Sequence, residues 1–208
     1  MASNTIDNGS HDIAIVRGTV DDVPAVINLL DTAVKWLVSR GGIGQWGATP
    51  FSENPQRAEQ LKESATTGHG LWLAIKVTDG TAMDQNQHSD IPPKAIEGEA
   101  PRSIIGAIAV GERMPYVAAV SEPELYVRLL VTDRQQAGNG IGKRLLEHAR
   151  DLAKGAGISL LRVDCYAGGE GNLAKYYESQ GFKPSERLDL EGWPCQVLVQ
   201  HLHEAKEE

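Results

Sequence analysis

The sequence predicts an α/β (α+β) fold built around a single sheet with helices packed against it. Two observations support this class. Short apolar stretches typical of buried strands alternate along the 208-residue chain with longer stretches whose apolar residues recur at helical spacing. At the centre of the chain, one such strand leads through a glycine-containing loop into an amphipathic helix. We expect strands at 12–17, 70–77, 103–110, 124–132, 159–165, 183–188 and 195–202, and helices at 19–40, 54–65, 141–157 and 172–181.

The first two helices are joined by an unusual loop. Thr19 and Asp22 have the spacing of an N-cap with acids in the first turn, and an apolar helical stripe follows them. The loop 42–51, between this helix and the shorter one at 54–65, carries large aromatic residues among glycines and a proline. In it, Trp46 is a candidate for stacking on a bound molecule or attracting its cationic nitrogen. The alternative is that its ring fills the core beneath the loop.

The segment 78–102 interrupts the pattern of strands and helices. It is polar and rich in proline, glycine and acidic residues, so it cannot bury enough apolar surface to offset the entropy of ordering it. Because apolar strands lie on both sides, we expect a hairpin with a mobile insertion and not a domain boundary. The start of the chain is also polar. The prediction is one domain over 12–203, with a disordered tail at 1–11.

The loop at 137–142 is a candidate phosphate-binding site. Ala137-Gly138-Asn139-Gly140-Ile141-Gly142 stands between the central strand and its helix, and is followed by Lys143. Glycines let a ligand approach the main chain, and the first N–H groups of a helix together with its dipole favour an anion such as a pyrophosphate.

Two familiar phosphate-binding motifs fit this loop imperfectly. A P-loop requires G-x-x-x-x-G-K-[ST], but Ala137 replaces the first glycine and Arg144 replaces the hydroxyl residue. A dinucleotide fingerprint requires G-x-G-x-x-G, but Lys143 replaces the third glycine. Asp164 lies near the distance expected of a ribose-binding acid, which keeps a nicotinamide enzyme as an alternative.

The same loop resembles the coenzyme A signature R/Q-x-x-G-x-G/A of the GNAT acetyltransferase superfamily. Ala137 stands where Arg or Gln is usual. Starting the pattern at Gln135 also satisfies it, two residues earlier, and we favour the later register because it places Gly142 at the helix start.

A second stretch resembles the C-terminal Y-E-x-x-G-F pattern of the same superfamily. It runs from Asn172 through Tyr177 to Phe182. The family asparagine usually lies seven residues before the tyrosine. Glu170 occupies that place here and Asn172 is offset from it.

The resemblance implies a mixed, mostly antiparallel sheet of six to seven strands, splayed at its centre and flanked by about four helices. The strands 124–132 and 159–165 are the pair expected to splay, and the pantetheine arm of acetyl-CoA would enter between them. The cofactor-binding residues implied are Leu130, Val131, Thr132, Ala137, Gly138, Asn139, Gly140, Ile141, Gly142, Lys143, Asn172 and Tyr176.

The implied chemistry is the direct attack of a primary amine on an acetyl thioester. Tyr177 matches the tyrosine that many family members use to protonate the leaving thiolate. A coenzyme thiol titrates at roughly 8.5 and a tyrosine at roughly 10, so this transfer is useful near neutral pH. The alternative for Tyr177 is a helix tyrosine that packs on the sheet, in which case the neighbouring Tyr176 is the next candidate.

Glu124 and Asp164 are the candidates for a catalytic base, because each stands at an end of a strand expected to splay. Glu124 is also a candidate substrate-binding residue, with Trp46. Either acid could instead form a surface ion pair. A backbone N–H near Val131 or Thr132 is expected, from the resemblance, to polarise the thioester carbonyl. Strand alternation places Tyr126, Arg128, Leu130 and Thr132 on one face and Val127, Leu129 and Val131 on the other.

The function expected is N-acetylation of a small-molecule or amino-acid-like amine by acetyl-CoA. A protein or peptide amine is a further possibility, and a non-catalytic coenzyme A sensor of the same fold is the competing class. The irregular Ala137 and Asn172 would suit such a sensor.

Composition argues against several other classes. A net charge of −8 argues against a nucleic-acid partner, and no apolar run reaches the roughly 18 residues of a membrane helix. Cys165 and Cys195, inside expected strands, lack the spacing of a metal site and indicate reduced thiols in the cytoplasm or another reducing compartment. We expect no metal, no membrane association, and a monomer or a homodimer.

Overall fold

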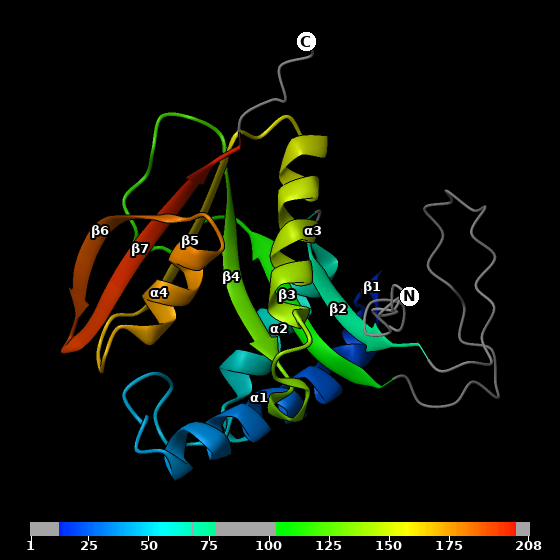
Figure 1. Cartoon of the computed structure of the whole chain (residues 1–208). Coiled ribbons are helices and arrows are strands. Elements are labelled where there is room, and N and C mark those ends of the chain that lie inside the picture. Colours follow the sequence, from blue (N-terminus) through cyan, green and yellow to red (C-terminus); the bar gives the residue numbers. More distant parts are fainter. Residues whose placement is uncertain (1–12, 68, 78–102, 203–208) are drawn as a thin grey trace, which may run out of the picture.

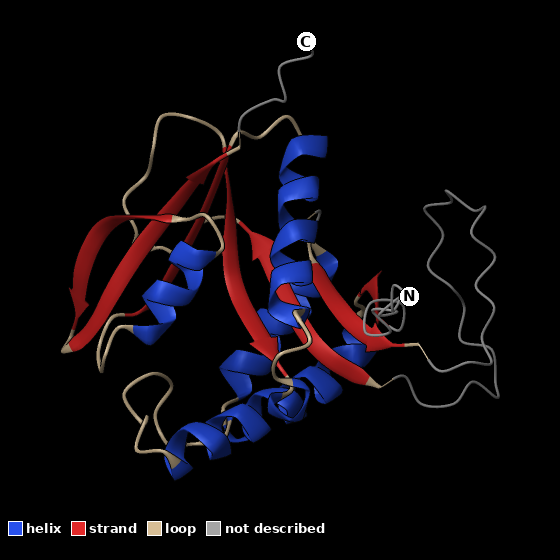
Figure 2. Ribbon diagram, in the orientation of Figure 1, coloured by secondary structure: helices blue, strands red, loops and turns tan. Residues whose placement is uncertain are grey.

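The computed structural model describes residues 13–67, 69–77 and 103–202, which form one seven-stranded sheet with helices on both faces (Figures 1 and 2). The strand order is β1-β2-β3-β4-β5-β7-β6. All neighbouring strands are antiparallel except β4 and β5, which are parallel, so the predicted mixed and mostly antiparallel sheet is confirmed. The strands are β1 (Ile13–Arg17), β2 (Leu71–Lys76), β3 (Ile104–Gly111), β4 (Glu124–Thr132), β5 (Leu160–Tyr166), β6 (Lys183–Leu190) and β7 (Trp193–His201).

The four α-helices cover the two faces of the sheet in pairs. Buried residues of α1 and α2 share one apolar cluster with β2 and β3, and buried residues of α3 and α4 share another with β3, β4 and β5. The helices are α1 (Val23–Ser39), α2 (Pro55–Thr66), α3 (Ile141–Gly155) and α4 (Asn172–Ser179). The predicted flanking helices are therefore confirmed.

Three short 3-10 helices were not expected from the sequence. They are Val20–Asp22, Phe51–Glu53 and Arg134–Gln136. The first of them takes the capping residues expected for α1: Thr19 donates through its main-chain N–H and its hydroxyl to the Asp22 carboxylate, at 2.8 and 3.0 Å. Each 3-10 turn leads into or out of an element that lines the site described below.

Strand β4 contains a bulge at Arg128. Val110 of β3 pairs with Val127, and the preceding residue Ala109 pairs with Leu129, so Arg128 has no partner of its own on β3. A bulge adds one residue to one strand and turns the following side chains to the other face.

This bulge overturns the alternation predicted for β4. Leu125 and Val127 pack with α3, whereas Leu129 and Val131 pack with α1 and α2. All four are odd-numbered, so a regular strand would have placed them on one face. The change of face at Arg128 cannot be read from an apolar strand sequence.

Strands β4 and β5 separate immediately beside this bulge. Their parallel pairing runs from Glu124 with Leu160 to Val127 with Val163 and then stops, although both strands continue. Beyond that point β4 remains paired with β3, and β5 with β7. Figure 1 shows the two strands diverging from their common end. The predicted splay at the centre of the sheet is confirmed.

The predicted tail at 1–11 and the predicted insertion at 78–102 lie outside the described residues. Within the part of the chain that the structure describes, no helix is both long enough and apolar enough to span a membrane.

Candidate active site

A cavity of about 470 Å³ opens where β4 and β5 separate. The first residues past the last parallel pair, Arg128 and Asp164, both line it. Three further residues predicted for the site line it as well, namely Trp46, Leu130 and Tyr177 of α4. The remaining wall includes three aromatic side chains, Tyr116, Tyr166 and Trp193.

Strand β4 offers main-chain groups to this gap. From Leu129 to Thr132 it is paired on the β3 side but not on the β5 side. Buried peptide groups need hydrogen-bond partners, so an extended ligand with amide groups fits this edge. Among the three residues predicted to contact it, Leu130 lines the cavity, Val131 is buried against the α1 face, and Thr132 pairs with Gly106.

The glycine loop forms the start of α3. Gly138 and Gly140 both have positive φ angles, of 91° and 69°, and a Cβ at either position would meet no atom within 4 Å. The first helical hydrogen bond runs from the Arg144 N–H to the Gly140 carbonyl at 3.0 Å. The N–H groups of the first turn therefore have no acceptor within the helix. Such a turn fits an anion.

Other loop residues predicted for the cofactor have modest contacts of their own. Ala137 follows the third 3-10 helix, and the Asn139 side chain donates to Gln136 at 3.1 Å. Lys143 is exposed, 3.7 Å from the Glu147 carboxylate. The helix begins at Ile141, so Gly142 lies in its first turn, as expected.

Gly142 brings α3 and α4 together. A Cβ there would collide with the hydroxyl of Tyr176, so only glycine lets this tyrosine lie against the start of α3. Burial raises the pKa of Tyr176. Asn172, at the start of α4, places its amide 3.4 Å from the Glu170 carboxylate and does not line the cavity.

Unlike Tyr176, the side chain of Tyr177 is buried away from the glycine loop. Only 5% of it is exposed, and its ring packs edge-on to Phe182 and Tyr176, with centroids 5.8 and 5.4 Å apart. Burial raises its pKa far above the ordinary value, so the hydroxyl keeps its proton. The two adjacent tyrosines thus serve two places: Tyr176 lies at the glycine loop, and Tyr177 at the cavity between the strands.

Asp164 is surrounded by neutral hydrogen-bond donors. Its carboxylate accepts from the hydroxyls of Tyr126 at 2.7 Å and Tyr116 at 3.1 Å, and the Cys195 thiol lies 3.7 Å away. Burial, and after it the charge of Asp164, raise the pKa of both tyrosines and raise the pKa of Cys195 to about 12. All three donors therefore stay protonated near neutral pH.

The position predicted for Glu124 beside the splay is wrong. Glu124 lies in the paired part of β4, opposite Leu160, and does not line the cavity. Its carboxylate is 2.8 Å from Arg162 and 3.9 Å from Arg113. Arg162 is 3% exposed, and a charge so buried needs a partner. The sequence showed an acid at a strand end but not which end of the strand pair opens.

The loop carrying Trp46 closes one side of the cavity. Trp193 donates through its indole N–H to the Gln45 carbonyl at 3.1 Å, and Gly44 lies against the Tyr166 hydroxyl. The Trp46 ring meets Phe51 edge-on at 5.5 Å. Trp46 therefore both lines the cavity and packs on the core, so the two interpretations of this residue are compatible.

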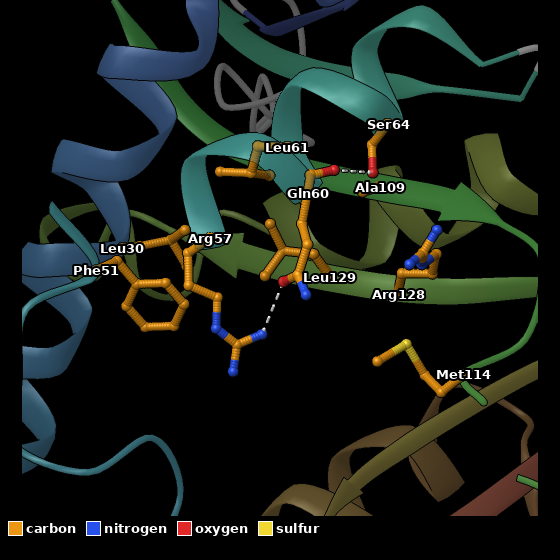
Figure 3. A pocket seen from close by; sticks show the side chains of 10 residues that line it. All are labelled: Leu30, Phe51, Arg57, Gln60, Leu61, Ser64, Ala109, Met114, Arg128 and Leu129. Carbon is orange, nitrogen blue, oxygen red and sulfur yellow. Dashed lines mark hydrogen bonds between the residues drawn. The ribbon is translucent and has the colours of Figure 1, made fainter. Parts of the chain in front are cut away.

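A smaller hollow of about 60 Å³ adjoins this cavity between α2 and β4 (Figure 3). The two share four lining residues, which are Arg57, Met114, Arg128 and Leu129. None of these four was among the predicted site residues. Arg128 did give a signal, since it is a charged residue within an apolar strand. Arg57 stands in a polar segment that resembles ordinary surface.

Within the described residues, no group of three or more His, Cys, Asp or Glu side chains could hold a metal ion. The cavity lies where β4 loses its pairing with β5, and the glycine loop begins the helix α3 that follows β4.

Comparison with known proteins agrees with this arrangement. Residues 56–182 match the model of the Acetyltransferase (GNAT) family. This match covers more than half of the chain, so the protein belongs to this family and is an acetyltransferase. No curated protein matches the sequence at a significant level.

Several solved structures share the fold. One is yncA, a putative acetyltransferase from Salmonella typhimurium with its cofactor acetyl-CoA, at 13% identity and a TM-score of 0.60 over 94% of this chain and 97% of that one. A variant of agmatine N-acetyltransferase has 16% identity and a TM-score of 0.60, over 92% and 100% of the two chains. The NatC complex bound to Gag peptide and CoA has 15% identity and a TM-score of 0.55, over 92% and 99%. At these identities the likeness concerns the fold.

Proposed function

We propose that the protein is an acetyl-CoA-dependent N-acetyltransferase that acetylates a primary amine of a small-molecule or amino-acid-like acceptor. The observation that carries this proposal is the separation of β4 and β5, which opens a cavity lined by Asp164 next to the strand that leads through the glycine loop into α3. When bound, acetyl-CoA supplies the activated acetyl thioester.

The coenzyme-binding residues proposed are those of the glycine loop and the open edge of β4. The main-chain N–H groups from Gly138 to Lys143 would bind the pyrophosphate. The main chain of Leu130, Val131 and Thr132 would pair with the pantetheine amides, and an N–H there would polarise the carbonyl. On α4, Tyr176, which lies against Gly142, and Asn172 would contribute further contacts to the coenzyme.

Tyr177 is the proposed general acid. Tyr177 lines the cavity, and its raised pKa means that its hydroxyl carries a proton at neutral pH. It would donate that proton to the thiolate as the acetyl group leaves.

Asp164 is the proposed partner of the acceptor amine. An alkylamine titrates at roughly 10.4 and is charged at neutral pH, so it must lose a proton before it attacks. The carboxylate would attract the ammonium group and take up this proton, directly or through water. Trp46 would contact the acceptor from the loop side.

The state of the two cysteines bears on the cell compartment in which the reaction would take place. Cys165 and Cys195 are both free thiols, which supports a reducing compartment such as the cytoplasm. A peptide amine is the second candidate acceptor, since the fold is shared with a complex that holds a peptide.

The test is the release of free thiol from acetyl-CoA in the presence of a panel of primary amines. The proposal predicts amine-dependent release, and a fall in kcat of about 10²–10⁴-fold in Tyr177→Phe with little change in coenzyme affinity. Tyr166→Phe, which removes a hydroxyl from the same cavity wall, is the control and should retain more activity. Coenzyme binding without thiol release for any amine, small or peptidic, would instead identify a coenzyme A sensor.

A further inference from the structure

Two arginines of the cavity have no acidic partner among the residues that the structure describes. Arg128 forms no ion pair or hydrogen bond with any residue that the structure describes, and Arg57 donates only to the Gln60 amide at 3.2 Å and lies over the Phe51 ring at 5.4 Å. Arg162 in the same sheet shows the opposite arrangement, with the Glu124 carboxylate 2.8 Å from its guanidinium. Within the described part of the chain, neither guanidinium at the cavity is therefore paired with a carboxylate.

The bulge in β4 places Arg128 at this position. Without a partner on β3, its side chain leaves the regular alternation of the strand and lines both hollows. Arg57 reaches the same two hollows from α2 (Figure 3). Met114 and Leu129 lie on the same walls, so the two guanidinium groups border a partly apolar space.

Asp164 is not the missing counterion. Both of its carboxylate oxygens accept hydrogen bonds from tyrosine hydroxyls, and no described arginine lies within ion-pair distance of it. It is the one acid that lines the larger cavity within the described residues. The cavity thus has a negative group, Asp164, on β5 and positive groups, Arg128 and Arg57, on β4 and α2. Asp164 and Arg128 are the first residues beyond the last parallel pair of β4 and β5.

We propose that Arg128, assisted by Arg57, binds a carboxylate of the acceptor, and that the acceptor is an amino acid or another amine that also bears a carboxylate. This inference rests on the proposed function, because it assumes that the acceptor occupies this cavity. A guanidinium offers two parallel N–H donors that match a carboxylate, a geometry that an ammonium group cannot provide. The acceptor's own ammonium group would then lie toward Asp164 and the thioester, on the opposite side.

The experiment compares amino acids with their carboxamides, for example L-alanine with L-alaninamide and L-phenylalanine with L-phenylalaninamide. The amide keeps the amine and the side chain but loses the charge. The quantity of interest is the ratio of kcat/KM for the acid to that for the amide, taken in each protein variant. Comparing this ratio between variants cancels the lower amine pKa of the amide.

The wild-type protein should favour the acids. In Arg128→Gln the acid-to-amide ratio should fall by about 10–100-fold, mostly through KM, because a charge-assisted bidentate contact is lost. Arg57→Gln should lower the ratio less, and Arg128→Lys should restore part of it. Lys62→Gln removes a positive charge from the exposed side of the same helix α2 and should leave the ratio unchanged.

Other outcomes separate this inference from the proposed function. Turnover of neutral amines or peptides only, or an equal loss for acids and amides in Arg128→Gln, would overturn the carboxylate site while the acetyltransferase stands. If no amine is acetylated, the proposed function fails. Calorimetric titration of the same amino acids into the CoA-saturated protein then decides the inference: binding that Arg128→Gln abolishes supports the site, and no binding overturns it.

Discussion

The two halves of β4 differ in what surrounds them. From Glu124 to Val127 the strand is paired with β5, and Tyr126 and Val127 are paired with β3 as well. From Arg128 onward it has no partner on the β5 side, and Leu129 to Thr132 are paired with β3 alone. The charged group of the first half, Glu124, is held by a buried arginine, and that of the second half, Arg128, has no described partner. A single strand thus stabilises the fold at one end and presents unpaired groups to a ligand at the other.

Replacing Glu124 tests the stabilising half most strongly. Glu124→Gln leaves the buried Arg162 without a counter-charge, and we expect a loss of about 3–5 kcal/mol in the free energy of unfolding, measured by urea denaturation. The kcat of the folded protein should change little, because Glu124 lies outside the cavity.

The matched control is Glu147→Gln, which breaks the exposed pair between Glu147 and Lys143. It should cost about 0–1 kcal/mol. The double variant Glu124→Gln with Arg162→Met should recover much of the loss, since no buried charge is then left alone. A large loss of kcat in Glu124→Gln with unchanged stability would contradict the division of β4 described above.

Gly142 tests the ligand-binding half. In Gly142→Ala the new methyl group collides with the Tyr176 hydroxyl, and overpacking of this kind costs about 1–3 kcal/mol. We expect a lower unfolding midpoint and weaker stabilisation by acetyl-CoA, because the turn of α3 and the start of α4 are pushed apart.

A second substitution makes this prediction specific. Adding Tyr176→Phe removes the colliding hydroxyl, and the next ring atom, Cζ, stands 3.4 Å from the added Cβ. The double variant should therefore regain stability relative to Gly142→Ala. Gly155→Ala in the same helix meets nothing within 4 Å and should be neutral or slightly stabilising. Failure of Tyr176→Phe to rescue would mean that the two helices do not meet as described.

The smallest effect that we expect is a change of folding stability with pH. Burial, followed by the charge of Asp164, raises the pKa of both Cys165 and Cys195 from 9.0 to about 12. Between these pH values the unfolded chain releases thiol protons that the folded protein keeps, so stability is fully present below pH 9 and falls as the pH rises toward 12. Thermal unfolding of the wild type and of Cys165→Ala with Cys195→Ala measures this. The double variant should lose less stability over that range, and identical slopes would show that the thiols are not buried beside Asp164.

Much of the fold could be predicted from the sequence, because periodicity reports which residues are buried. The seven strands, the four α-helices and the start of α3 at the glycine loop follow from apolar spacing and from glycine positions. The mobile segment expected at 78–102 is outside the described residues.

The candidate site was predictable only in part. Periodicity cannot show the bulge at Arg128, so the faces of β4 were assigned wrongly after it. It also cannot show at which end parallel strands separate, which is why Glu124 was misplaced and Asp164 was not. Arg57, Tyr116 and Trp193 come from segments far apart in the chain and meet only in the folded protein.

The central claim is that the open half of β4 and the glycine loop bind a coenzyme A thioester. Its most direct test is thermal unfolding of the wild-type protein with acetyl-CoA, coenzyme A and NAD(P)H in separate samples. A ligand at about a hundred times its Kd stabilises the folded state by about 2.7 kcal/mol, which raises the midpoint measurably. The account predicts that acetyl-CoA and coenzyme A raise the midpoint and that the nicotinamide does not. No shift with either coenzyme A species, or a shift with the nicotinamide alone, would contradict it.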